Sequence, residues 1–195
     1  MKRAFIIHGW EGFPEEDWFP WLKKALETRD FKVTVPQLPD AAKPRIFNWV
    51  PKVTAVVGTP DEDNYLIGHS LCYQTIARYL ESLPTGVKVG GAVFVAGFFK
   101  HLTGLEAYAA VQETDRHWLG TPIDLAKVKA HLNQSVAIFS DNDPYVPLDN
   151  QDDFKNKLGC KIVIEHHKGH FSGPGDEVME LPVVLTVMLG MSDWR

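Results

Sequence analysis

The sequence has few of the features that mark disulfide-rich, metal-binding or membrane-spanning proteins. Only two of its 195 residues are cysteines, Cys72 and Cys160, and they neither make a disulfide framework nor match a metal-ligand spacing. No apolar run approaches the roughly 20 residues that cross a membrane. We therefore predict a protein with no metal site, no membrane span and a reducing, cytoplasmic location.

The sequence also lacks an excess of positive charge. It has 20 basic and 25 acidic residues, a net charge of -5, which favours solubility and argues against a nucleic-acid partner. The start, MKRAFIIHG, has two positive charges, but its apolar run is too short for a secretory signal. The composition, 45% hydrophobic and 23% charged, is that of a globular protein. We expect residues 1–195 to form one domain.

Short apolar runs alternate with helical patterns along the chain, and no internal repeat or low-complexity linker interrupts them. This alternation predicts an α/β protein with a mostly parallel sheet of about six strands and helices on both faces. The predicted strands are residues 4–7, 31–35, 65–67, 91–96, 135–139 and 161–165. The predicted helices are residues 18–26, 46–57, 125–132, 148–158 and 182–189, with a further helix after Ser70 that includes residues 76–80.

Three details of this pattern predict local structure. Asp17 is positioned to cap the helix that follows it. Pro51 either kinks the helix at 46–57 or starts a second segment. Residues 97–120 have no clear period and are rich in aromatic side chains, so we predict that they form a short lid or pocket wall.

A serine between a predicted strand and a predicted helix is the strongest functional signal. Gly68-His69-Ser70-Leu71-Cys72 nearly matches G-x-S-x-G, the strained turn that exposes a nucleophilic serine at the end of a strand. Small residues are needed two positions before and after the serine, and Cys is a small apolar substitute for the second glycine. The alternative interpretation is that Ser70 only caps the helix.

The neighbours of Ser70 have simpler interpretations. His69 is interpreted as a packed residue of the turn rather than a catalyst. Cys72 is disfavoured as an alternative nucleophile, because it should point back toward the sheet from its place at the start of the helix.

A serine hydroxyl needs a base to take its proton, and His170 is the candidate. It follows the strand at 161–165, and an imidazole titrates near neutral pH. His166 and His167 lie in the same loop and remain alternatives. Gly169 favours His170 because it lets the backbone turn there.

The base needs a carboxylate on its second ring nitrogen, and Asp143 follows the strand at 135–139. Asp141 competes from two residues away, but the position of Asp143 before Pro144 lies closer to the next helix. The order Ser70, Asp143, His170 is that of α/β-hydrolases. All three residues follow predicted strands, and active sites gather at the carboxyl ends of parallel strands.

The tetrahedral intermediate of acyl transfer has an oxyanion that N–H donors must stabilise. Leu71 supplies one backbone donor at the start of its helix. The other should come from the loop after the first strand, where His8-Gly9-Trp10 places the N–H of Trp10. Gly9 allows a close approach, and His8 is interpreted as an anchor for the loop.

Several motifs together resemble a known family over residues 4–190. They are His8-Gly9, DWFPWL at 17–22, GHSL at 68–71, SDNDPYVP at 140–147 and GHF at 169–171. The chain resembles the small serine-hydrolase family of α/β-hydrolase fold that includes the retinoblastoma-binding serine hydrolase and its bacterial relatives. The departure is Cys72, where the family pattern has glycine. A larger side chain there bears on activity, by widening the turn or crowding the oxyanion site, more than on the fold.

The resemblance implies a reduced α/β-hydrolase fold with a short lid and no metal or organic cofactor. Carried over by motif, Ser70 is the nucleophile, Asp143 the orienting acid and His170 the base. Trp10 and Leu71 are then the oxyanion donors.

We therefore expect a serine hydrolase that cleaves small carboxylic esters, with thioesters or amides as variants. Trp10, Phe13, Phe99 and Trp118 are expected to line an apolar substrate pocket, whereas Trp18 and Phe98 are as readily explained as core. The alternative function is a catalytically weak or inactive hydrolase-fold protein that binds protein partners, suggested by Cys72 and by the name of the resembled family.

Overall fold

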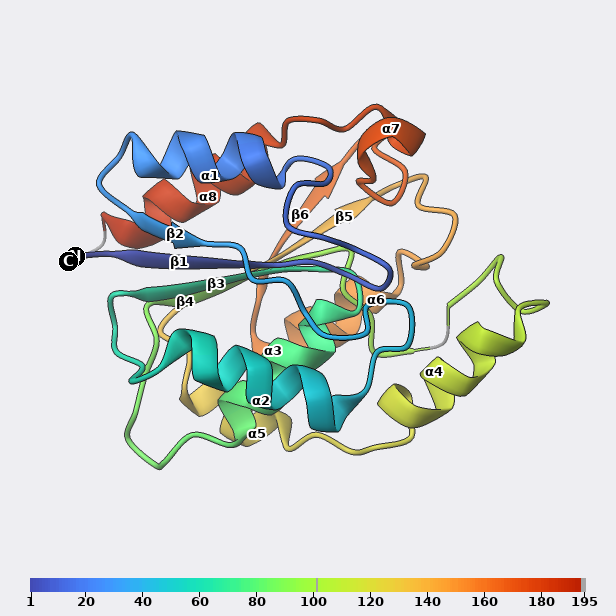
Figure 1. Cartoon of the computed structure of the whole chain (residues 1–195), viewed down its shortest axis with the longest axis horizontal. Helices are drawn as coiled ribbons and strands as arrows, with labels where there is room; N and C mark the ends of the chain where they lie inside the picture. The colour runs from blue at the N-terminus through green and yellow to red at the C-terminus, as the bar shows by residue number, and fades with distance from the viewer. Residues whose placement is uncertain (101, 194–195) are drawn as a thin grey trace.

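A six-stranded parallel sheet lies at the centre of the protein (Figure 1). The computed structural model describes residues 1–100 and 102–193, with the backbone alone at 110, 115 and 174. Residue 101 of the predicted lid and residues 194–195 of the predicted domain lie outside the described residues. The strand order is β2-β1-β3-β4-β5-β6. The strands are β1 (Arg3–Ile7), β2 (Lys32–Thr34), β3 (Asn64–His69), β4 (Gly91–Val95), β5 (Ser135–Ser140) and β6 (Lys161–Glu165).

The central strands are apolar because both faces of the sheet are covered. Every residue of β3 and β4 is buried, as continuous apolar runs in a parallel sheet require. The register pairs Ile6 of β1 with Ile67 of β3 and Ile67 with Val93 of β4. The six predicted strands and their parallel pairing are confirmed.

Helices pack on the two faces as separate layers (Figure 1). One layer holds α1 (Phe19–Glu27) and α8 (Pro182–Ser192), over a core that includes Trp18 and Tyr65. The other holds α2 (Ile46–Val57), α3 (Cys72–Glu81) and α5 (Leu125–Ala130), over a core that includes Trp49 and Phe94. The remaining helices are α4 (Ala109–Leu119), α6 (Asn150–Asp153), the π-helix η1 (Phe154–Leu158) and α7 (Gly173–Asp176).

Some local structure differs from the prediction. Asp17 does not cap α1: the N-cap is Trp18, and Asp17 itself has φ +51°. Helix α2 continues through Pro51 as one segment. Its buried face packs against α3, and this packing outweighs the backbone hydrogen bond that proline removes. Residues 97–120 contain a regular helix, α4, that the sequence pattern did not reveal.

The order of the strands determines where a ligand-binding crevice is expected at the carboxyl ends of the sheet. From β1 the chain first adds β2 on one side and later β3 on the other. The crevice at the carboxyl ends of such neighbouring strands is where open α/β sheets bind ligands. Within the described residues, no helix is both long and apolar enough to cross a membrane.

Candidate active site

Four loops at the carboxyl ends of the strands bring the predicted site residues together. Trp10 follows β1, Ser70 follows β3, Asp143 follows β5 and His170 follows β6. Their positions therefore result from the parallel sheet, which places the ends of strands distant in sequence at one edge.

Ser70 lies in a strained turn between β3 and α3. Its φ is +54°, a left-handed conformation that a non-glycine residue rarely adopts. Its N–H donates to the carbonyl of Val95, at 2.8 Å. The strand and helix nearly touch: a Cβ on Gly68 would lie 2.6 Å from Cδ1 of Ile76 and 3.3 Å from the backbone of Cys72. This is the geometry that the G-x-S-x-G pattern describes.

A chain of hydrogen-bonding groups connects Ser70 to a buried carboxylate. The Oγ of Ser70 lies 2.9 Å from Nε2 of His170. The Nδ1 of His170 lies 2.9 Å from Oδ2 and 3.1 Å from Oδ1 of Asp143. The side chain of Asp143 is only 2% exposed, and its Oδ1 accepts the N–H groups of Tyr145 and Val146. The carboxylate therefore has a fixed orientation toward His170.

The competing residues form a separate pair at the surface. Nδ1 of His166 lies 2.6 Å from Oδ2 of Asp141, and the backbone N–H of His167 donates to Oδ1 of Asp141. Their hydrogen bond lowers the pKa of Asp141 and raises the pKa of His166. The structure thus brings Asp143 and His170 to Ser70. Asp141 instead pairs with His166 and holds the loop after β6.

Two backbone N–H groups are available beside Ser70. Within the described residues, the N–H groups of Trp10 and Leu71 have no hydrogen-bond acceptor. Leu71 precedes the first residue of α3, where the helix dipole favours negative charge. The loop of Trp10 approaches the turn closely, because a Cβ on Gly9 would lie 3.3 Å from Cβ of Ser70.

His8 and Cys72 have structural roles beneath this loop. Nε2 of His8 accepts the N–H of Leu38, so its Nδ1–H donates to the carbonyl of Gly9. Burial lowers the pKa of His8, which keeps it neutral. Cys72 is buried, and its Sγ–H donates to the carbonyl of His8. Burial also raises the pKa of the Cys72 thiol, so the side chain packs under the turn as an uncharged group.

The four residues predicted for a substrate pocket have different environments. Phe13 is 48% exposed, and Trp10 and Phe99 are half-buried. Trp118 is instead fully buried, and its Nε1–H donates to the carbonyl of Pro44. The structure therefore places Trp118 in the core, with no surface to offer a substrate. The sequence shows only that residue 118 is aromatic, and an aromatic side chain fits a core as well as a pocket wall.

Tyr145 is a site residue that the sequence analysis did not single out. Its ring packs edge-on against His170, with 5.3 Å between the ring centroids. The carbonyl of Tyr145 accepts the N–H of Thr103, so Tyr145 joins the loop of Asp143 to the chain that leads to α4. The signal available in the sequence was its place two residues after Asp143.

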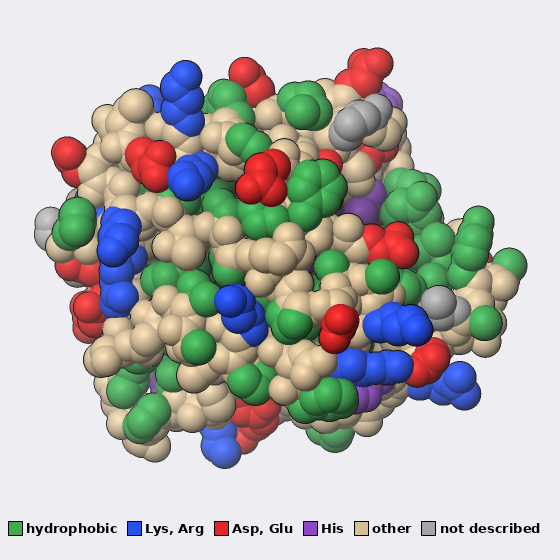
Figure 2. Space-filling model, viewed as in Figure 1, with side chains coloured by type: hydrophobic (Ala, Val, Ile, Leu, Met, Phe, Trp, Pro, Cys, Tyr) green, Lys and Arg blue, Asp and Glu red, His purple; other side chains and the backbone are tan. Residues whose placement is uncertain are grey.

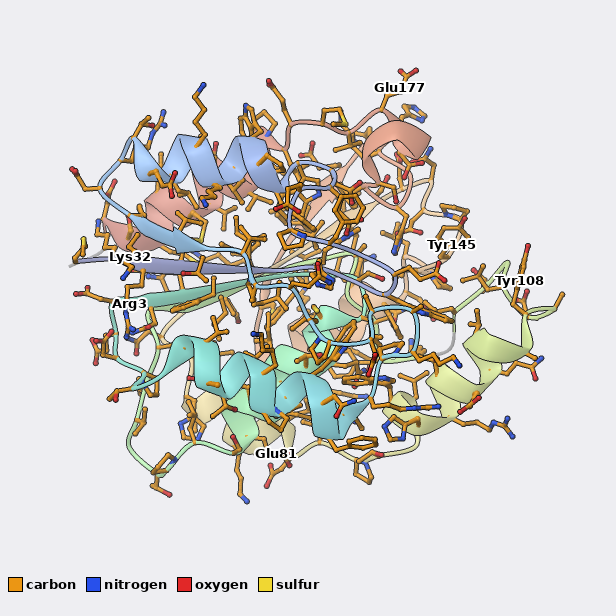
Figure 3. The ribbon with its side chains drawn as sticks, in the orientation of Figure 1. Arg3, Lys32, Glu81, Tyr108, Tyr145 and Glu177 are labelled. Atoms are coloured by element: carbon orange, nitrogen blue, oxygen red, sulfur yellow. The ribbon has the colours of Figure 1, made fainter. Side chains whose placement is uncertain are left out.

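Helix α4 and the loop before it project from the body of the molecule (Figure 1). Tyr108 lies at the outer end of this projection (Figure 3) and is exposed. Hydrophobic side chains are visible at the outer part of this projection, and acidic and basic side chains lie along its lower side (Figure 2). Arg78 of α3 ties the base of α4 to the body by donating to the carbonyls of Trp118 and Thr121.

Two cavities of the described residues lie away from Ser70. One of about 780 Å³ opens at the amino ends of β4 and β5, between Gly90 and Ser135. Another of about 420 Å³ lies between Asp40 and Asn48. Among the described residues, no three His, Cys, Asp or Glu side chains are grouped as a metal site.

Two titratable side chains behind His170 were given other roles in the sequence analysis. His69 is fully buried, and burial lowers its pKa to about 3. Asp17, predicted as a helix cap, instead accepts the N–H of Gly173 in the loop after His170. Burial raises the pKa of Asp17. Contacts between residues so far apart in sequence leave no local pattern that would reveal them.

Comparisons with known proteins identify a matching family and relatives of this chain. A family model described as serine hydrolase matches residues 4–176. The putative hydrolase YdeN of Bacillus subtilis is 30% identical over 187 residues, 96% of this chain and 94% of that protein. The serine hydrolase RBBP9 of Rattus norvegicus is 27% identical over 190 residues, 96% of this chain and 95% of that protein.

Solved structures show the same fold. The structure of the B. subtilis ydeN gene product has a TM-score of 0.89 and 28% identity, covering 99% of this chain and all of that one. Est1E from Butyrivibrio proteoclasticus, solved with ferulic acid bound, has a TM-score of 0.72 and 15% identity, covering 99% and 90%. At that identity the second likeness concerns the fold alone.

Proposed function

The chain belongs to the serine hydrolase family, and from this premise we propose that it cleaves small carboxylic esters through an acyl-enzyme on Ser70. The observation that carries the proposal is the connected geometry of Ser70, His170 and Asp143, with 2.9 Å at each of the two contacts. A serine, a base and an orienting carboxylate in this arrangement are the requirements of nucleophilic acyl transfer.

Asp143 sets the protonation state of the base. A carboxylate only accepts hydrogen bonds when ionised, so Nδ1 of His170 carries the ring proton and Nε2 is free. Nε2 then takes the proton of Ser70 as Oγ attacks the ester carbonyl. Asp143 stabilises the imidazolium that forms.

The N–H groups of Leu71 and Trp10 donate hydrogen bonds to the developing oxyanion and so form an oxyanion hole. The tetrahedral intermediate collapses when Nε2–H of His170 gives its proton to the alcohol oxygen, and the alcohol leaves. A water molecule, deprotonated by the same nitrogen, then attacks the acyl-enzyme. When the second tetrahedral intermediate collapses, Nε2–H of His170 returns this proton to the serine Oγ, the carboxylic acid leaves and both side chains are restored.

The surroundings of Ser70 favour a small acyl group. Trp10, Phe13 and Phe99 offer partly exposed apolar surface, and residues 102–120 are proposed to act as a short lid at the site. Thioesters and amides are variants of the same chemistry, because they pass through the same oxyanion.

The decisive experiment compares the wild type with Ser70→Ala on p-nitrophenyl acetate and butyrate. The variant should lose its turnover while its circular dichroism and Tm remain those of a folded protein. Turnover that survives the substitution unchanged would refute the proposal.

The alternative function is a hydrolase-fold protein without activity that binds protein partners. Cys72 suggested it, but its side chain fits beneath the turn on the carbonyl of His8 rather than over Ser70. A fluorophosphonate probe separates the two functions: an activated Ser70 becomes covalently labelled, and an inert serine does not.

A further inference from the structure

Both polar groups of the His170 backbone, the N–H and the carbonyl, have a hydrogen-bond partner. Its N–H donates to Oδ2 of Asp176 in α7, at 2.8 Å. Its carbonyl oxygen lies 2.8 Å from Nε2 of His69, the residue that precedes Ser70. One contact is local to the loop, whereas the other joins two loops whose residues lie 101 positions apart.

The protonation state of His69 follows from this contact. A carbonyl oxygen only accepts hydrogen bonds, so Nε2 of His69 must carry the proton and donate it. Burial lowers the pKa of His69 to about 3, so the ring is neutral and its Nδ1 carries no proton. The ring lies 5.1 Å from that of His170. A charged His69 would therefore oppose the positive charge that His170 gains when it takes the serine proton.

Asp17 holds the continuation of the same loop. Its Oδ1 accepts the N–H of Gly173, and its Oδ2 lies 3.9 Å from Nδ1 of His69. Both side chains are almost fully buried. The loop from His170 to Gly173 is thus attached at one end to the turn of Ser70 and at the other to the loop before α1.

We propose that His69 is a positioning residue: its neutral imidazole donates Nε2–H to the His170 carbonyl and so sets the distance between the base and Ser70. Asp17 supports this arrangement by fixing the far end of the loop. The proposal rests on the proposed function, since it concerns the base of that reaction. His69 touches neither the substrate nor the reacting atoms.

The contact matters because proton transfer depends steeply on distance. His170 must reach Ser70 at 2.9 Å and then reach the leaving oxygen. A displacement of about 1 Å in such a group lowers the rate by about 100-fold. His69 directly precedes Ser70 in the chain. Its hydrogen bond to the His170 backbone therefore fixes the position of the proposed base relative to the same turn that holds the proposed nucleophile.

The test compares two substitutions of His69. His69→Phe keeps the ring and its volume but removes the donor, whereas His69→Gln restores an N–H donor at a similar reach. We expect His69→Phe to lower kcat about 10- to 100-fold with KM changed less than threefold. His69→Gln should recover most of kcat, and fluorophosphonate labelling of Ser70 should follow the same order.

His131 provides the matched control. It is also buried, and its Nδ1 lies 2.6 Å from a backbone carbonyl, that of Val87, beyond the amino ends of the strands. His131→Phe deletes a similar hydrogen bond far from Ser70, so it should lower Tm and leave the kcat of the folded protein unchanged. A His69→Phe variant that loses no more kcat than His131→Phe would overturn the proposal, as would a His69→Gln variant equally impaired.

A measurement on the wild type does not depend on how the variants fold. Nitrogen-15 spectra of the histidine rings should show His69 as the neutral Nε2–H tautomer throughout pH 5 to 9. A His69 that titrates in this range, or that carries its proton on Nδ1, overturns the proposal. Wild-type turnover that survives Ser70→Ala would refute the proposed function, whereas Ser70-dependent turnover with a fully active His69→Phe refutes this inference alone.

Discussion

At the scale of single residues, hydrogen bonds from its own loop fix the orientation of the Asp143 carboxylate. Its Oδ1 accepts two backbone N–H groups, from Tyr145 and Val146, so its Oδ2 faces His170 without rotating. A buried carboxylate needs such hydrogen bonds to remain ionised away from water. The side chain is therefore oriented by its own loop toward His170, the proposed base.

Substituting Asp143→Asn tests this orientation. The amide oxygen should occupy the Oδ1 position and accept the two backbone N–H groups, which directs the NH₂ group at Nδ1 of His170. His170 would then carry its proton on Nε2, where it cannot accept the serine proton. We expect kcat to fall about 10³- to 10⁴-fold, measured with p-nitrophenyl butyrate, with little change in Tm.

Asp141→Asn is the matched control, because Asp141 pairs with His166 at the surface. It should retain kcat within about threefold. A comparable loss of kcat in both variants would mean that Asp143 has no special role.

At the scale of elements, the loop between β1 and α1 contacts both the turn of Ser70 and the loop that follows His170. Its start carries the N–H of Trp10, and its end carries Asp17, which holds the loop of His170. Glu16 lies inside it: a Cβ on Gly12 would come within 3.0 Å of the His8 ring and still closer to the Glu16 carboxylate. Burial, with a smaller contribution from Asp17, raises the pKa of Glu16 to about 7.

This pKa predicts a pH dependence of stability. In the unfolded chain Glu16 releases its proton near pH 4.5, whereas the native protein keeps it to about pH 7. Between these values the native state binds more protons, so the free energy of unfolding falls as pH rises. Glu16→Gln removes this loss and should raise Tm at pH 8, with little effect at pH 4.

Glu15→Gln, at an exposed neighbouring position, should shift Tm equally little at both pH values. Thermal unfolding of the three proteins at pH 4 and pH 8 makes the comparison. A Glu16→Gln variant no more stable than the wild type at pH 8 would contradict the expected cost of ionising this half-buried carboxyl group.

At the scale of the whole molecule, the site lies at one edge of the sheet and the larger cavity at the other. The cavity of about 780 Å³ is lined by Gly90, Ser135 and other residues near the amino ends of β4 and β5, so it cannot receive an acyl group attached to Ser70. We therefore expect a long acyl chain on Ser70 to find only the partly exposed apolar surface of Trp10, Phe13 and Phe99.

This arrangement predicts the dependence on acyl length. Each methylene that is buried contributes about 0.8 kcal/mol, close to a fourfold gain in affinity. We expect kcat/KM for p-nitrophenyl esters to be highest from acetate to butyrate and then to stay level or fall. A steady fourfold rise per methylene up to decanoate would reveal an acyl tunnel and contradict the prediction.

The sequence by itself indicated the six strands and the candidate nucleophile. Apolar runs bounded by turn residues located the six strands, and Gly68 before Ser70 indicated the turn. These features are local, because a strand's burial and a turn's backbone geometry depend on residues next to one another. The family resemblance rested on such local motifs too.

Only the tertiary structure decided which side chains meet. It brought His170 rather than His166 to Ser70, buried Trp118, and used Asp17 to hold a loop instead of a helix end. These outcomes depend on strand order and on contacts between loops distant in sequence. A pattern of neighbouring residues carries no record of such contacts, so the packing of the whole sheet had to be known.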